Sequence, residues 1–138
     1  NDTGAKYVNS PETPVFHKSR LLYGLDKARR HIVQERRATL CEGQIDVIRC
    51  HQAGLTQAVC AQGTAFTEQH ARILKRYADS VVIVFDSDKA GRDAAIRAAA
   101  VLIDVGLVAK IAISNFLIFI QCSMKKSVKI LDTQIDWT

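Results

Sequence analysis

The chain has 138 residues, of which 48% are hydrophobic and 24% are charged. A chain of this length can bury a core of its own and is expected to form one ordinary domain, and its composition excludes a disordered or collagen-like protein. The most apolar stretch, residues 111–120, is interrupted by Ser114 and Asn115 and is far shorter than the roughly 20 residues that span a bilayer. No signal peptide opens the sequence, so we expect a cytoplasmic protein with no membrane partner.

The net charge of +5 is concentrated in the first quarter of the chain. Residues 1–37 hold eight Lys and Arg against four Asp and Glu, whereas residues 38–138 hold eleven against ten. A basic segment of this kind suits a polyanionic partner, because neutralising phosphates releases their counterions. From charge alone, a solvated basic surface explains the segment equally well.

The first 20 residues contain both prolines of the chain and no sustained periodicity, so they are expected to be loop with at most short strands. Apolar residues then recur at helical spacing and predict an amphipathic helix over residues 21–33. Beyond this helix, strand and helix patterns alternate. The predicted strands are 38–41, 58–61, 81–85 and 108–113, and the predicted helices are 44–53, 67–78 and 89–105. This alternation predicts an α/β fold, a Rossmann-like four-stranded parallel sheet flanked by helices.

Turn and cap residues fit these boundaries. Gly54 and Gly106 stand just past two predicted helices, where a left-handed cap favours glycine, and Thr67 is a candidate N-cap. The four cysteines show no CxxC pair and no zinc-finger spacing, so no zinc site is expected. Cys41 and Cys60 fall in apolar runs and are expected to be buried free thiols.

Acidic residues follow two of the predicted strands. Glu42 comes directly after the first strand, Asp86 and Asp88 come after the third, and Asp46 lies one helical turn beyond Glu42. The carboxyl ends of parallel strands share one edge of the sheet, so these side chains are expected to meet there. Four carboxylates repel one another at neutral pH and favour a shared hard cation, Mg²⁺ or Mn²⁺.

Structural roles compete with this interpretation for two of the four acids. Asp88 stands where an N-cap is needed, and Asp46 would be favoured by the positive end of the helix dipole. Capping explains Asp86 and Glu42 less readily.

Two motifs carry a resemblance to a known family. The sequence EGQIDVI at residues 42–48 resembles EGYMDVI of the Toprim core of bacterial DnaG-type primases, and DSDKAGR at residues 86–92 resembles their DGDxAGR. Further matches are KYVNSPETP (6–14), FHK (16–18), LYGL (22–25) and QGTA (62–65), so the resemblance covers about residues 6–112. Gln44 and Ser87 replace the usual Tyr and Gly.

The resemblance implies a role for each matching position. Glu42, Asp86 and Asp88 correspond to catalytic acids, and together with Asp46 they correspond to ligands of Mg²⁺, with Mn²⁺ as a substitute. The nucleic-acid or nucleotide contacts implied are Lys6, Lys18, Arg20 and Arg92. For the lysines, solvated side chains are the competing interpretation. The implied mechanism is cation-assisted attack of a 3′-hydroxyl on an α-phosphorus, with no protein nucleophile.

The expected function is that of a DNA primase fragment, which makes short RNA primers on single-stranded DNA from nucleoside triphosphates. The replicative helicase would be contacted through a domain that this chain lacks. Other Toprim activities, namely topoisomerase or nuclease-type strand cleavage, and a degenerate Toprim module that only binds nucleic acid are the alternatives. The expected division is a basic segment at 1–36, a Toprim domain at 37–113 and a divergent tail at 114–138. The tail lacks the GxDPD segment with which the family continues.

Overall fold

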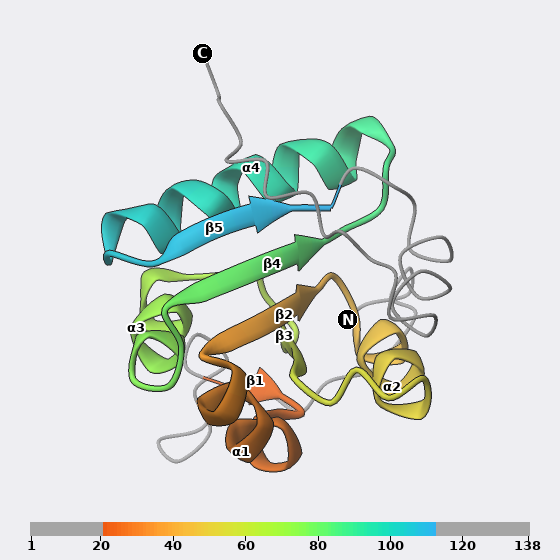
Figure 1. Cartoon of the computed structure of the whole chain (residues 1–138). Helices are drawn as coiled ribbons and strands as arrows, with labels where there is room; N and C mark the ends of the chain where they lie inside the picture. The colour runs from red at the N-terminus through yellow and green to blue at the C-terminus, as the bar shows by residue number, and fades with distance from the viewer. Residues whose placement is uncertain (1–20, 113–138) are drawn as a thin grey trace.

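Strands and helices alternate along residues 21–112, which are the residues that the computed structural model describes (Figure 1). Predictions that fall on residues 1–20 and 113–138 lie outside this part. The strands are β1 (Leu22–Tyr23), β2 (Arg37–Cys41), β3 (Ala58–Ala61), β4 (Ser80–Val84) and β5 (Val108–Ile111). The helices are α1 (Leu25–Glu35), α2 (Gln44–Gln52), α3 (Glu68–Lys75) and α4 (Lys89–Asp104).

The strands form one sheet with the order β1-β3-β2-β4-β5. Strands β2 to β5 pair with one another in parallel, which confirms the four predicted parallel strands. Strand β1 adds a short antiparallel edge, in which Leu22 pairs with Ala61 and Tyr23 with Cys60. The sheet therefore has five strands in the described part of the chain instead of the four expected.

The prediction of a helix from residue 21 is wrong at its first turn, because β1 occupies residues 22–23 and α1 begins at Leu25. Gly24 separates the two elements with a φ of 86°, in the left-handed region. A Cβ at Gly24 would lie 3.0 Å from Val47 Cγ1 and 3.2 Å from the Ala58 carbonyl oxygen. The chain thus turns at Gly24, where α2 and β3 approach it closely. The prediction is wrong here because apolar spacing alone does not distinguish a strand followed by a helix from one longer helix.

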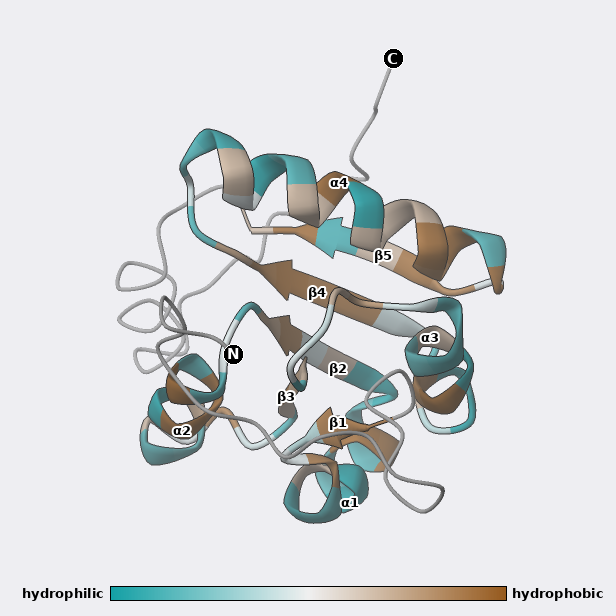
Figure 2. Cartoon of the chain, turned by 180° about the vertical axis from the view of Figure 1, so that it is seen from behind, coloured by the Kyte–Doolittle hydropathy of each residue, from teal (hydrophilic) through white to brown (hydrophobic). Residues whose placement is uncertain are grey.

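Side chains on the strands alternate between two faces of the sheet, as the period of a β-strand requires. Leu40, Val81 and Ile83 belong to a core cluster with residues of α1, α3 and α4. Cys41, Val82 and Val84 belong to a second cluster with Val47 and Cys50 of α2. Three helices therefore cover one face, and α2 packs on the other (Figures 1 and 2).

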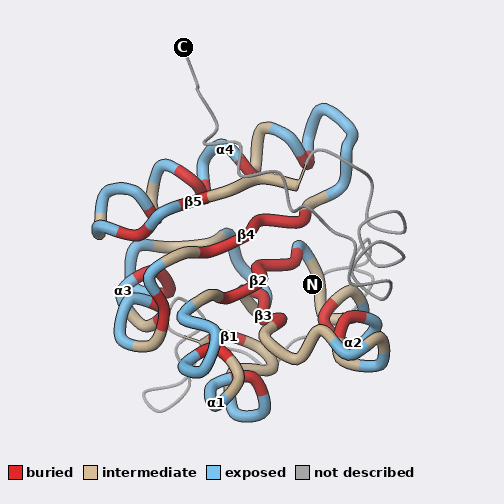
Figure 3. The backbone as a smooth tube through the Cα atoms, in the orientation of Figure 1, coloured by how far each residue is buried: buried red, intermediate tan, exposed pale blue. Residues whose placement is uncertain are grey.

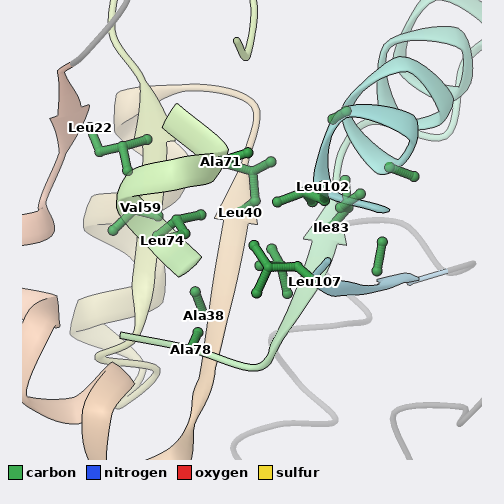
Figure 4. Packing of buried hydrophobic residues seen from close by; sticks show 14 of the residues in the cluster. Leu22, Ala38, Leu40, Val59, Ala71, Leu74, Ala78, Ile83, Leu102 and Leu107 are labelled. Atoms are coloured by element: carbon green, nitrogen blue, oxygen red, sulfur yellow. The ribbon is translucent and has the colours of Figure 1, made fainter. Parts of the chain in front are cut away.

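Figure 3 shows buried positions along the central strands and on parts of the helices. Small side chains on the helices complete the larger cluster (Figure 4). Helix α4 contributes Ala95, Ala98 and Ala99 beside Leu102, and α3 contributes Ala71 beside Leu74. Alanine lets a helix backbone approach the sheet closely. The remaining space between the helices and the sheet is filled by larger side chains of β2 and β4, such as Leu40 and Ile83. Burying one Leu, Ile or Val side chain stabilises the fold by about 1.5–3 kcal/mol.

Most predicted boundaries agree with the structure to within one residue. Helix α3 is shorter than predicted, since it ends at Lys75 rather than residue 78. Gly54 and Gly106 both have a φ of 91°, and Thr67 accepts a hydrogen bond from the His70 amide, so the predicted caps are confirmed. Among residues 21–112, no helix is long and apolar enough to cross a membrane. The division of the chain at residues 36 and 113 stays a prediction, although β1 and α1 share the sheet and core of the later elements.

Candidate active site

The carboxyl ends of β2 and β4 lie side by side and carry the first two acids. The two strands pair along their whole length, ending with Cys41 opposite Val84. Glu42 follows Cys41 directly, and Asp86 stands two residues beyond Val84. The Asp86 amide donates a hydrogen bond of 3.0 Å to Glu42 Oε1. Residues 44 positions apart are therefore joined at this edge.

The predicted grouping of acids is visible in the electrostatics of Glu42. The pKa of its carboxyl is raised, first by partial desolvation and further by the negative charges of Asp86, Asp88 and Asp46. The hydrogen bond from the Asp86 amide acts in the opposite direction. Ionised Glu42 is thus disfavoured by its neighbours, and a bound cation would offset this repulsion.

Helix α2 places Asp46 at the same edge. Gly43 is the extended N-cap residue of α2, and Asp46 lies in the first turn of the helix. Its charge raises the pKa of Cys60, after the larger effect of burial, and also that of Glu42, so Asp46 is near enough to influence both groups. Asp46 can therefore interact with the positive end of the α2 dipole and also belong to the group of acids.

Residues 86–88, named the acidic loop here, are fixed at the start of α4. Asp88 Oδ1 accepts a hydrogen bond of 2.7 Å from the Gly91 amide, which confirms its role as N-cap. The cap uses one of the two carboxylate oxygens, so capping and cation binding do not exclude each other. Arg92 Nη1 donates to the Ser87 carbonyl oxygen at 2.6 Å.

Gly91 is a residue that the sequence interpretation did not single out. A Cβ at this position would lie 2.0 Å from the Asp86 carbonyl oxygen and 3.0 Å from Asp88 Oδ1. The acidic loop can therefore fold back on α4 only because residue 91 has no side chain. Inside a helix, glycine lowers stability by about 1 kcal/mol relative to alanine. A glycine within the predicted helix 89–105 is therefore the sequence signal that could have identified this residue.

Cys41 and Cys50 lie beneath the acidic edge. Their sulfur atoms are 3.6 Å apart, and both residues are buried. The thiol contact with Cys50 and burial raise the pKa of Cys41 well above its usual value. Burial also raises the pKa of Cys60 to about 12. All three are free thiols, as expected for Cys41 and Cys60.

The acids do not form a ready cation cage. Among residues 21–112, no group of three or more His, Cys, Asp or Glu side chains is arranged closely enough to hold a metal ion. The donors at this edge are carboxylate oxygens, the ligands that suit Mg²⁺ and Mn²⁺, and Mg²⁺ commonly keeps several waters beside one or two carboxylates. The chemistry of the donors fits such a cation. Lys6, Lys18 and Arg20 lie outside the described residues.

With this geometry, comparison with known proteins decides the family. The profile of the Toprim-like family matches residues 39–116, more than half of the chain. The chain belongs to the Toprim-like family. In addition, the profile described as the N-terminal domain of the DNA primase catalytic core matches residues 1–29.

Relatives of this Toprim chain are similar over most of its length. It is 45% identical over 103 residues to the DNA primase of Listeria monocytogenes, which covers 75% of this chain and 16% of the relative. It is 49% identical over 98 residues to the DNA primase of Chlamydia pneumoniae, which covers 70% of this chain and 17% of the relative. The Toprim chain thus spans about a sixth of the length of the relatives it matches.

Solved structures show the same arrangement. The Aquifex aeolicus primase, in a structure of its zinc-binding and RNA polymerase domains, superposes with a TM-score of 0.82 at 33% identity, covering 91% of this chain and 32% of that one. A DNA primase domain from Pseudomonas aeruginosa gives 0.74 at 40% identity, covering 83% and 37%. A DnaG primase catalytic domain bound to single-stranded DNA gives 0.70 at 39% identity, covering 81% and 37%.

Proposed function

We propose that this Toprim chain is the metal-holding part of a DNA primase, which makes short RNA primers on single-stranded DNA from nucleoside triphosphates during replication. The proposal depends mainly on the hydrogen bond from the Asp86 amide to Glu42 Oε1. This bond joins the acids that follow β2 and β4 at one edge of the sheet. The primase relatives and the match of residues 1–29 to the primase N-terminal domain support priming over strand cleavage.

In this proposal Glu42, Asp46, Asp86 and Asp88 hold Mg²⁺, or Mn²⁺ in its place. The cation would supply charge stabilisation at the triphosphate and at the attacking 3′-hydroxyl. Glu42, Asp86 and Asp88 are the catalytic residues of the proposal. Among these residues, Glu42 is the proposed acceptor of the proton of that hydroxyl.

Binding of template and nucleotide falls to basic residues. Lys6, Lys18 and Arg20 are the proposed contacts to template or nucleotide phosphates, in the region of the chain with the largest positive excess. Such contacts position the strand without reading its bases. One related structure is that of a DnaG primase catalytic domain bound to single-stranded DNA, which supports this partner class. The growing RNA primer and, through another domain, the replicative helicase complete the proposed partners, and the proposed location is the cytoplasm.

A chimera tests the proposed function directly. The matched segment of the Listeria monocytogenes DNA primase would be replaced by residues 6–112 of this chain and assayed for RNA synthesis on single-stranded templates with Mg²⁺. We expect primer synthesis, and we expect Glu42→Gln in the chimera to lower its rate by about a hundredfold or more while the circular dichroism spectrum is unchanged. A folded chimera that cleaves strands, or that makes no primers, would contradict the proposal.

A further inference from the structure

Arg92 lies in the first turn of α4, beside the acidic loop. Its Nη1 donates a hydrogen bond of 2.6 Å to the Ser87 carbonyl oxygen, in the middle of the loop. Its amide donates to the Asp88 carbonyl oxygen at 2.9 Å. The side chain and the backbone of one residue therefore contact two successive carbonyl groups of the loop.

The loop is held at each of its three residues by a different partner. Glu42 accepts from the amide of Asp86, Arg92 donates to the carbonyl of Ser87, and the Gly91 amide donates to the side chain of Asp88. Of these three contacts, the one to Ser87 is the one in which a cationic side chain is the donor. A guanidinium is always protonated and forms stronger hydrogen bonds than a neutral donor.

We propose that Arg92 is a positioning residue for the acidic loop, and that it acts on catalysis by fixing the directions in which Asp86 and Asp88 point. This inference rests on the proposed function and revises the role in nucleotide binding that the sequence implied for Arg92. The contacts with Glu42 and Gly91 hold the two ends of the loop, and the hydrogen bond from Arg92 holds Ser87, the residue between the two aspartates.

Electrostatics and positioning predict opposite signs for the loss of Arg92. A positive charge beside a cation site repels the cation, so removing Arg92 would strengthen cation binding if only its charge mattered. Loss of a hydrogen bond that orients the metal ligands instead weakens metal affinity, commonly about tenfold or more. Lys89 provides the matched control, because it carries the same charge on the same turn of α4 but donates to Asp93, away from the loop.

The first measurement needs no metal. Amide hydrogen exchange in the 138-residue chain is compared for the unsubstituted protein, Arg92→Ala, Arg92→Lys and Lys89→Ala. We expect Arg92→Ala to accelerate exchange at Asp86 and Gly91 by about threefold to tenfold, since their amides donate to the loop carboxylates or to Glu42. Lys89→Ala should leave these rates unchanged, and Arg92→Lys should restore part of the protection. Equal rates in Arg92→Ala and the unsubstituted chain would overturn the proposal.

The second measurement is the dissociation constant for Mn²⁺ by electron paramagnetic resonance. We expect Arg92→Ala to weaken binding about tenfold, Arg92→Lys to recover part of the loss, and Lys89→Ala to leave binding unchanged or slightly tighter. Tighter binding in Arg92→Ala would overturn the positioning role. If the unsubstituted chain bound no Mn²⁺, the proposed cation site would fail, and hydrogen exchange would still decide the role of Arg92.

Discussion

At the scale of single residues, the surroundings of Glu42 at the acidic edge and of Cys60 in the smaller core cluster disfavour the ionised forms of both side chains. Glu42 and Cys60 both have raised pKa values, for which desolvation is the largest cause. For Glu42 the neighbouring acids add to the shift, which is typical of carboxylates that are gathered at one site. For Cys60 the same physics has a structural result, because a buried thiol of high pKa is a poor nucleophile.

The raised pKa of Cys60 predicts a specific dependence of stability on pH. Burial raises its pKa to about 12 in the fold from an ordinary value of 9.0, so stability is fully present below pH 9 and is lost as the pH rises toward 12. At pH 10.5 the thiol should lower the free energy of unfolding by about 2 kcal/mol relative to pH 8. Urea titrations of the unsubstituted chain and Cys60→Ala at both pH values measure this difference. An identical pH dependence in the two proteins would contradict the assignment.

At the scale of elements, the turn from β4 into α4 determines where the acids stand. The loop runs so close to the helix that Gly91 meets the Asp86 carbonyl oxygen. The register of β4 and the start of α4 bring Asp86 and Asp88 to the edge of the sheet. The close contact at Gly91 then determines how near the Asp86 backbone lies to α4.

We therefore expect Gly91→Ala to destabilise the chain. Alanine has the higher helix propensity, by about 1 kcal/mol, but a Cβ 2.0 Å from a carbonyl oxygen forces backbone movement that costs about 1–3 kcal/mol or more. In Gly43→Ala the nearest atom to the new Cβ would be Asp46 Oδ2 at an ordinary 3.9 Å, so we expect only the smaller cost of replacing a glycine N-cap. Thermal unfolding measures both variants. A Gly91→Ala protein as stable as the unsubstituted chain would show that the loop does not fold back as described.

The elements also show how far the sequence could predict the molecule. Short apolar runs predict β2 to β5, and helical patterns predict α2 to α4. Acids at the strand ends predict one edge for Glu42 and Asp86. The β1 strand could not be predicted, because a strand of two residues shows no periodicity. An apolar residue at position 22 fits a helix as well as a strand. The contacts of Arg92 with Ser87 and of Glu42 with the Asp86 amide depend on backbone groups, which no sequence pattern records.

At the scale of the whole molecule, the chain corresponds to a small part of its primase relatives. The Toprim chain spans 16% and 17% of the two primase relatives described above. The proposed reaction requires template, primer end and nucleotide to be held in a near-attack geometry, in which a misplacement of about 1 Å can cost a hundredfold in rate.

We therefore expect the 138-residue chain by itself to make no primers, even where its cation site forms. The test is RNA synthesis on single-stranded templates with Mg²⁺ or Mn²⁺, with Glu42→Gln as the control for contaminating polymerase. Robust synthesis that disappears in Glu42→Gln would show that the chain is a self-sufficient polymerase.

The central claim, that the acids of β2 and β4 share one cation, is tested most directly by Mn²⁺ binding to the unsubstituted chain and to Asp86→Asn/Asp88→Asn. Asparagine caps a helix as well as aspartate does, so α4 should survive. The control is Glu35→Gln/Asp104→Asn, which removes two exposed charges from the ends of α1 and α4. We predict weak Mn²⁺ binding that the first double variant abolishes and the control retains. Equal binding by all three proteins would contradict the account.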